Sequence, residues 1–170
     1  MKKPLKITLI IVICIIVFLA AAMVIYKAVF SMGIAEQFES GNANSAKKVL
    51  IASQGSKFKN TLTKTVVKQL NEKNVFVKVI DVTNLDKINE NDFQAILIIH
   101  TIEAWDAPKT VVKFLGNTRK SEKILLVATS GRGTYKAKNT NIDTITSASK
   151  MDKIDSISVE IIARLDKILK

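Results

Sequence analysis

Three short polar segments contain the residues whose types could bind a ligand. The first runs from Ser53 to Thr61 and combines hydroxyl, amide and amine groups with one glycine. The second runs from His100 to Asp106, and the third is Thr129-Ser130-Gly131. Hydroxyls, lysines and the free N–H groups at the start of a helix all donate hydrogen bonds to phosphate oxygens. The first segment therefore predicts a phosphate site.

Composition excludes several other kinds of chemistry. The 170 residues include one Cys and one His, so neither an internal disulfide nor a Cys/His zinc site can form. Glu103 and Asp106 are close in sequence, but no nucleophile, histidine and acid form a recognisable pattern. We therefore predict no catalytic residue and no metal site, and the sequence leaves open whether the protein is an enzyme.

The charge is strongly basic but diffuse. The formal net charge is +11, from 26 basic and 15 acidic residues, and only Arg119, Arg132 and Arg164 are arginine. Lysine does not offer the bidentate recognition that arginine gives to bases and phosphate. Because the basic residues are spread along the chain without interleaved aromatics, we expect no nucleic-acid partner. Anionic lipid headgroups are a more natural partner for this charge.

The first thirty residues contain a membrane segment. Residues Ile7 to Tyr26 include no charged side chain. Twenty helical residues span about 30 Å, which matches the hydrocarbon core of a bilayer. A cleaved signal peptide is the alternative, with Ala20-Ala21-Ala22 as its cleavage site. The apolar run continues beyond these alanines, which favours an uncleaved single-pass anchor.

The lysines around this segment predict its orientation. Lys2, Lys3 and Lys6 precede the apolar run, and Lys27 follows it. By the positive-inside rule, the N-terminus stays in the cytoplasm and the rest of the chain is extracytoplasmic, at the cell membrane.

The remaining chain alternates between short apolar runs and helical patterns. We expect strands at residues 48–52, 75–80, 95–99, 124–128 and 142–147. Helical patterns follow the first strand, begin again at Pro108, and close the chain from Ile154 to Leu169. The connection before the fifth strand is short, so its helix should be short or absent. These elements predict an α/β fold, a doubly wound five-stranded parallel sheet, behind one N-terminal transmembrane helix.

The chain divides accordingly into four predicted regions. Residues 1–6 form a basic tail, 7–26 the transmembrane anchor, 27–46 a juxtamembrane linker and 47–170 the α/β domain. In doubly wound sheets, ligands bind at the carboxyl ends of the strands. The three polar segments follow the first, third and fourth strands, so we expect them at one edge.

The order and spacing of these segments resemble the flavodoxin-like family over residues Lys47 to Lys170. In that family the first strand enters a loop around the phosphate of flavin mononucleotide (FMN), which Gly55 to Thr61 match. The third strand enters a Gly-Thr-Pro-x-aromatic loop, where this chain has His100 to Trp105. After the fourth strand the family often has Thr-Ser-Gly, as at Thr129-Ser130-Gly131.

The resemblance implies FMN as cofactor and a set of contacts to it. The function implied is electron transfer, or reduction of a small acceptor, with a redox partner protein. Residues at the first loop would hold the phosphate, and residues of the other two loops would lie near the flavin ring. The implied contacts are Ser53, Gly55, Ser56, Lys57, Lys59, Asn60, Thr61, Thr101, Trp105, Thr129, Ser130 and Gly131.

An alternative follows from four departures from the family pattern. Lys59 and His100 stand where the family usually has glycine, Ile102 replaces a usual proline, and Ala104 takes an aromatic position. In this alternative the chain is a flavin-free binding or scaffold module at the membrane surface. Ser56 or Asn60 then caps the helix that follows the first strand.

Overall fold

A sheet of mostly parallel strands fills the centre of the second of two separate units. The structure is a computed structural model, and it describes residues 3–30, 32–103, 106–134 and 141–170. Residues Met1–Met32 form one unit and Gly33–Lys170 the other. The first unit holds helix α1 (Lys3–Phe30), in which Lys6–Ile25 is long and apolar enough to cross a membrane. Signal sequences have the same length and composition, so this observation fits both readings of the segment.

In the residues that the structure describes, seven strands form the sheet. They are β1 (Gly33–Ile34), β2 (Phe38–Ser40), β3 (Lys48–Gly55), β4 (Phe76–Asp81), β5 (Ala95–Thr101), β6 (Ile124–Ser130) and β7 (Asp143–Ala148). The strand order is β2-β4-β3-β5-β6-β7, and β1 pairs with β3. Strands β3 to β7 pair in parallel, whereas β1 and β2 are antiparallel to their neighbours.

The prediction of a five-stranded sheet is therefore corrected to seven strands. All five predicted strands form, but β1 and β2 lie within residues 27–46, which the sequence indicates as linker. Two and three residues are too short for a hydrophobic alternation to be visible. The first predicted strand is also longer than expected, because its carboxyl end, Gln54 and Gly55, pairs with β1.

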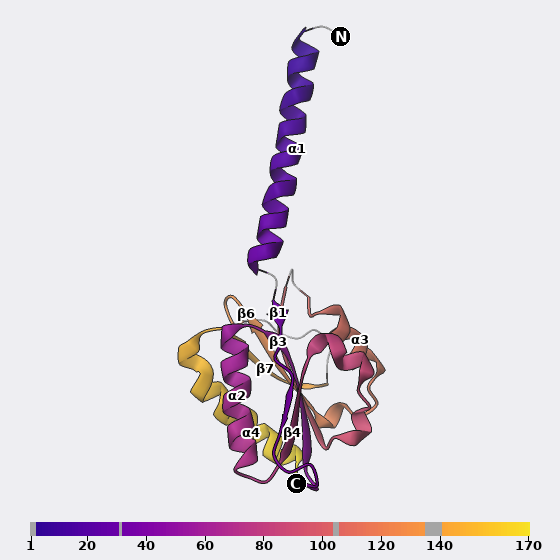
Figure 1. Ribbon diagram of the computed structural model, residues 1–170, viewed down its shortest axis with the longest axis vertical. Coiled ribbons are helices and arrows are strands. Elements are labelled where there is room, and N and C mark those ends of the chain that lie inside the picture. The colour runs from indigo at the N-terminus through magenta and orange to yellow at the C-terminus, as the bar shows by residue number, and fades with distance from the viewer. Residues whose placement is uncertain (1–2, 31, 104–105, 135–140) are drawn as a thin grey trace. The chain divides into compact units, whose positions relative to one another are not determined.

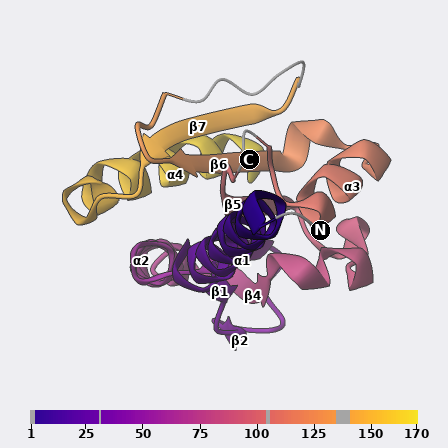
Figure 2. The same ribbon diagram turned by 90° about the horizontal axis from the view of Figure 1, so that it is seen from above.

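Helices cover both faces of the sheet (Figures 1 and 2). Helices α2 (Lys57–Asn71) and α4 (Ile154–Ile168) lie on one face, and α3 (Lys109–Asn117) lies on the other. Short 3₁₀ helices at Val82–Lys87, Glu90–Asp92, Ser121–Lys123 and Met151–Lys153 complete the connections. No helix occurs between β6 and β7 in the residues that the structure describes there.

Two apolar clusters hold these layers together. The larger joins α2 and α4 to the sheet and includes Leu62, Val66 and Leu165. The smaller lies under α3 and includes Ile96 and Ile98. Because β5 contributes alternate residues to each cluster, it is buried on both faces, as its unbroken apolar sequence predicts.

Candidate functional site at the carboxyl edge of the sheet

The carboxyl ends of β3, β5 and β6 lie side by side at one edge of the sheet. Ser53 is in register with Ile99, and Thr101 is in register with Thr129. The three polar segments of the sequence therefore meet, as the predicted topology requires.

The junction between β3 and α2 is tight. Strand β3 continues to Gly55, and α2 begins at Lys57, so Ser56 alone separates them. The Ser56 Oγ accepts a hydrogen bond from the Lys59 N–H at 3.2 Å and caps the helix. The Thr61 hydroxyl donates to the Lys57 carbonyl at 2.9 Å, back along its own helix. Both hydroxyls thus act within α2.

Strand β1 covers the end of β3. Gly33 pairs with Gly55, and Ile34 pairs with Gln54. A side chain on Gly55 would have its Cβ 2.3 Å from the Ile34 carbonyl oxygen and 2.7 Å from the Gly33 carbonyl carbon. The backbone of β1 therefore occupies the space directly above Gly55.

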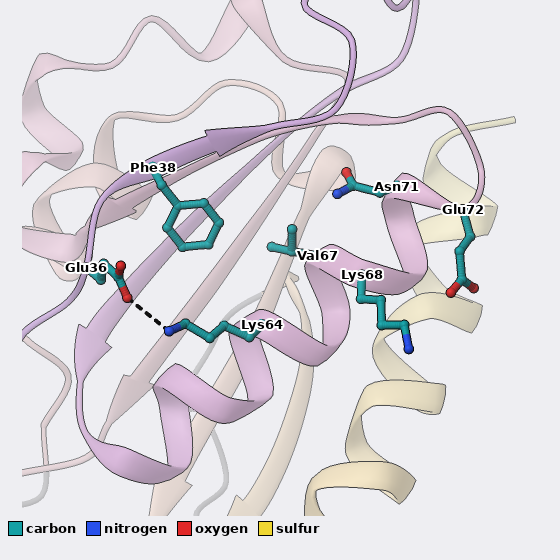
Figure 3. A pocket seen from close by; sticks show the side chains of 7 residues that line it. All are labelled: Glu36, Phe38, Lys64, Val67, Lys68, Asn71 and Glu72. Carbon is teal, nitrogen blue, oxygen red and sulfur yellow. Dashed lines mark ion pairs between the residues drawn. The ribbon is translucent and has the colours of Figure 1, made fainter.

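The residues that follow β1 anchor it to the domain. The Ala35 N–H donates to Asp81 Oδ2 at 2.6 Å, and both residues are buried. The second oxygen of Asp81 accepts from the N–H and the hydroxyl of Thr83. Glu36 then forms an ion pair with Lys64 of α2 at 3.1 Å (Figure 3). The segment is thus fixed at several points.

A groove of about 610 Å³ lies next to this ion pair, between β2 and α2. Phe38 and Val67 provide its apolar surface, and Lys68 and Glu72 stand at its rim (Figure 3). The groove lies along α2, and none of the predicted flavin contacts lines it.

Lys59 is the central residue of the carboxyl edge. Its exposed fraction is 0%, and its Nζ donates to Thr101 Oγ1 at 2.6 Å. The Thr101 hydroxyl lies 3.1 Å from the Thr129 hydroxyl, which donates to the His100 carbonyl at 3.2 Å. A chain of hydrogen bonds thus runs from α2 across the ends of β5 and β6.

Burial controls the protonation of the two bases at this edge. It lowers the pKa of Lys59 from 10.5 to about 8, and the nearby Glu103 carboxylate offsets part of that effect. Burial also lowers the pKa of His100, whose Nδ1 lies 3.3 Å from the Thr101 carbonyl. His100 is therefore a neutral, hydrogen-bonded residue of the buried strand.

Gln54 links the same edge to the loop after β5. Its Oε1 accepts from the Thr101 N–H at 2.6 Å, and its Nε2 lies 3.4 Å from Glu103 Oε1. Glu103 is exposed, and its backbone pairs with that of Asp106 through two hydrogen bonds of 3.0 Å. The buried amide of Gln54 thus faces an exposed carboxylate.

The other predicted contacts do not gather around one space. Ser53 is buried and donates to the Gln54 carbonyl at 3.1 Å, and Lys57 is exposed. Asn60 is half-buried and lines a very small cavity beside Ala35.

The third polar segment forms a turn of its own. The Ser130 hydroxyl accepts from the Gly133 N–H at 3.0 Å, and Gly131 is exposed. Trp105 and Ala104 lie outside the described residues, so the predicted stacking of Trp105 on a ring stays a prediction.

These positions do not fit the phosphate of FMN. The hydroxyls of Ser56 and Thr61 are used within α2, and the Lys59 amine points to Thr101. The space over Gly55, where a phosphate would approach the backbone, is filled by Ile34. The contacts implied by the family pattern remain predictions, but their geometry does not form a phosphate cage.

The order of the parallel strands defines the class of fold. The five parallel strands lie side by side in the order β4-β3-β5-β6-β7. If they are numbered by their position in the chain, this order is 2-1-3-4-5. This is the flavodoxin-like order of doubly wound sheets.

One solved structure agrees with this class at the level of the fold. The chain resembles the metal-soaked Flv1 flavodiiron core from Synechocystis sp. PCC6803, with a TM-score of 0.52 and 10% identity over 74% of this chain. It spans 36% of that chain, about a third of its length. General stress protein 14 from Treponema denticola, solved in complex with FMN, matches with a TM-score of 0.41 and 15% identity, covering 72% of this chain and 99% of that one. No family model and no curated protein matches the sequence.

The chain therefore has the flavodoxin-like fold. Of the predicted site residues, the structure brings together Lys59, Thr101 and Thr129. Sequence reasoning gave no role to Gln54 and Glu103, the two residues that complete the cluster. The sequence did carry a signal for both residues. Gln54 follows the predicted first strand, and Glu103 lies in the predicted loop after the third strand.

Proposed function

We propose that this chain is a membrane-tethered flavodoxin-like module that binds its ligand or partner without FMN. The observation that carries the proposal is the closed carboxyl edge, where β1 packs on Gly55 and the buried Lys59 amine donates to Thr101. In this reading the fold supplies a rigid edge with buried donors, and no cofactor is required.

The proposed location rests on α1. We propose that α1 is retained as a single-pass anchor in the cell membrane, with the Gly33–Lys170 unit outside the cytosol. The apolar length of Lys6–Ile25 supports the anchor, and the three lysines before Ile7 support the orientation.

A second candidate is the FMN-binding electron carrier that the family resemblance implies. It is favoured by the convergence of the polar segments at the carboxyl edge, with Thr101 beside Thr129. Bound FMN would supply the electron chemistry, and the protein would only hold and tune it. A redox partner protein belongs to this candidate alone.

Titration of FMN separates the two candidates. The full chain in nanodiscs of neutral phosphatidylcholine is expected to cause no saturable quenching of flavin fluorescence. Saturable quenching with micromolar affinity, weakened by Ser56→Ala and Thr61→Ala, would instead establish the second candidate. Ser56→Ala also removes the N-cap of α2, so unfolding of both variants is measured first; a cap contributes about 1 kcal/mol.

A further inference from the structure

We propose that the cavity between α3 and the 3₁₀ helices Val82–Lys87 and Glu90–Asp92 is a binding site for a neutral saccharide. The cavity has a volume of about 530 Å³, which is within the size range of small-molecule sites. It shares no lining residue with the carboxyl edge of the sheet. The inference therefore goes beyond the proposed function and does not depend on whether that edge binds FMN.

One wall of the cavity is a row of side chains along α3. Four residues of this helix line the cavity at spacings of three and four positions, so they share one face of the helix. They are Thr110, Lys113, Phe114 and Asn117. The row presents a hydroxyl, an ammonium group, an aromatic ring and an amide to the same space.

The opposite wall, from residues 85–91, is fixed by contacts to the end of α3 and the start of β6. The Thr118 hydroxyl, at the C-cap of α3, donates to Glu90 Oε2 at 2.5 Å. The buried Lys123 ammonium donates to the Glu90 carbonyl and, at 2.8 Å, to the Phe93 carbonyl. The wall is thus held in place without a ligand, which lowers the cost of ordering it on binding.

Three residues give the cavity an apolar surface. Leu85 is buried, and Ile88 and Phe114 are half-buried; all three belong to the smaller apolar cluster under α3. Ligand sites combine such a surface with a few polar groups that fix orientation. The C–H face of a pyranose ring can pack on this surface while its hydroxyls reach the polar groups.

The polar groups of the lining are available to a ligand. Within the residues that the structure describes, four polar side chains of the lining form no hydrogen bond or ion pair with the protein. They are Asp86, Thr110, Lys113 and Asn117. A carboxylate only accepts hydrogen bonds, an ammonium group only donates them, and a hydroxyl or an amide does both.

This mixture of groups disfavours a ligand with a net charge. The carboxylates of Asp86 and Glu90 repel an anion, and the Lys113 ammonium repels a cation. A hydroxyl both donates and accepts, so one ligand with several hydroxyls can match all of these groups. A neutral saccharide combines several hydroxyls with an apolar face. A zwitterionic amino acid carries both charges, and it is the competing ligand class in the test.

Saturation-transfer NMR on the full chain in nanodiscs of neutral phosphatidylcholine tests the site. The saccharide probes are maltose, cellobiose and N,N′-diacetylchitobiose, and leucine represents the competing class. At least one disaccharide is expected to bind in a saturable way with millimolar affinity, and leucine is expected not to bind. Nanodiscs without protein give the background signal.

Two variants and their matched controls locate the binding. Asp86→Ala and Lys113→Ala each remove an unpaired charged group from the lining, and each should weaken binding about tenfold, as expected for one hydrogen bond to a charged group. Asp152→Ala and Lys109→Ala change residues of the same types that do not line the cavity. Asp152 lies in another 3₁₀ helix and Lys109 in α3, and both controls should bind as the wild type does. All four side chains are exposed, so the variants should fold, and thermal unfolding checks this.

Each outcome decides the proposal. Absence of saturable binding for all three disaccharides overturns it. Unchanged affinity in both Asp86→Ala and Lys113→Ala also overturns it, because the saccharide then binds elsewhere. Saturable binding of leucine alone overturns the saccharide class. The FMN titration reports separately on the carboxyl edge, so failure of this site and failure of the proposed function are distinguishable.

Discussion

Replacement of Lys59 by methionine is expected to raise the free energy of unfolding at pH 7 by about 2 kcal/mol, a net value of two opposing effects. The difference between a pKa of 10.5 and one of about 8 corresponds to about 3 kcal/mol of cost for burying the charge. Loss of the hydrogen bond to Thr101 offsets about 1 kcal/mol of that gain. A methionine side chain can fill the same buried space.

The same substitution should remove a pH dependence. The unfolded chain holds the Lys59 proton up to about pH 10.5, whereas the folded chain releases it from about pH 8. The unfolded state therefore binds more protons between these values, and wild-type stability rises with pH across that window. Below pH 8 both states are protonated and the full cost is present. Besides burial, the Glu103 carboxylate acts on Lys59 and raises its pKa, and the Lys59 ammonium in turn helps to lower the pKa of His100.

Denaturant unfolding at pH 7, 8, 9 and 10 measures both effects. The difference between the wild type and Lys59→Met should be largest at pH 7 and shrink toward pH 10. Lys57→Met is the matched control, since Lys57 is exposed in the first turn of the same helix. A constant difference at every pH would show that the Lys59 amine is not buried as described.

Alanine at Gly55 is the second substitution with a large expected effect. Its Cβ would lie 2.3 Å from the Ile34 carbonyl oxygen and 2.6 Å from the Ile34 carbonyl carbon, both backbone atoms. Strand β1 must move away, and we expect a loss of about 1–3 kcal/mol, as for other overpacked sites. Chemical denaturation gives the loss, and amide exchange at Ile34 should accelerate.

Gly116 provides the comparison for this variant. Nothing lies within 4 Å of a Cβ added there, and Gly116 is in helix α3. Gly116→Ala should therefore be neutral or stabilising by up to about 1 kcal/mol. If Gly55→Ala behaves in the same way, β1 does not pack on β3.

The parallel strands and the polar edge could be predicted because their signals are local. Ala95 to Ile99 is wholly apolar, and this pattern requires a strand that is covered on both faces. The helix that begins after Pro108 could likewise be predicted, because proline is common at the start of a helix. The edge follows from these elements, since parallel strands end on the same side.

The closure of that edge could not be predicted in the same way. Strand β1 has two residues, and its pairing with Gly55 depends on contacts between distant parts of the chain. Asp81, which anchors Ala35, is 46 positions away from it. Such contacts leave no periodic pattern in the sequence.

The burial of Lys59 did leave a signal. Lys59 is three residues before Leu62 and seven before Val66, so helical periodicity places it on the apolar face of α2. The family pattern directs attention to a phosphate at this position. Periodicity alone predicts a lysine that points into the domain, as the structure has it.

Reactivity of the lysine amines tests the closed edge most directly. The full chain is treated with a limiting amount of acetic anhydride at pH 8, and labelling of each lysine is read by peptide mass spectrometry. If the edge is closed, Lys59 should be labelled far more slowly than Lys57 and Lys64, which are exposed. A pKa of about 8 leaves much of the Lys59 amine neutral and reactive at this pH. Labelling of Lys59 as fast as Lys57, or faster, would therefore contradict the closed, flavin-free edge.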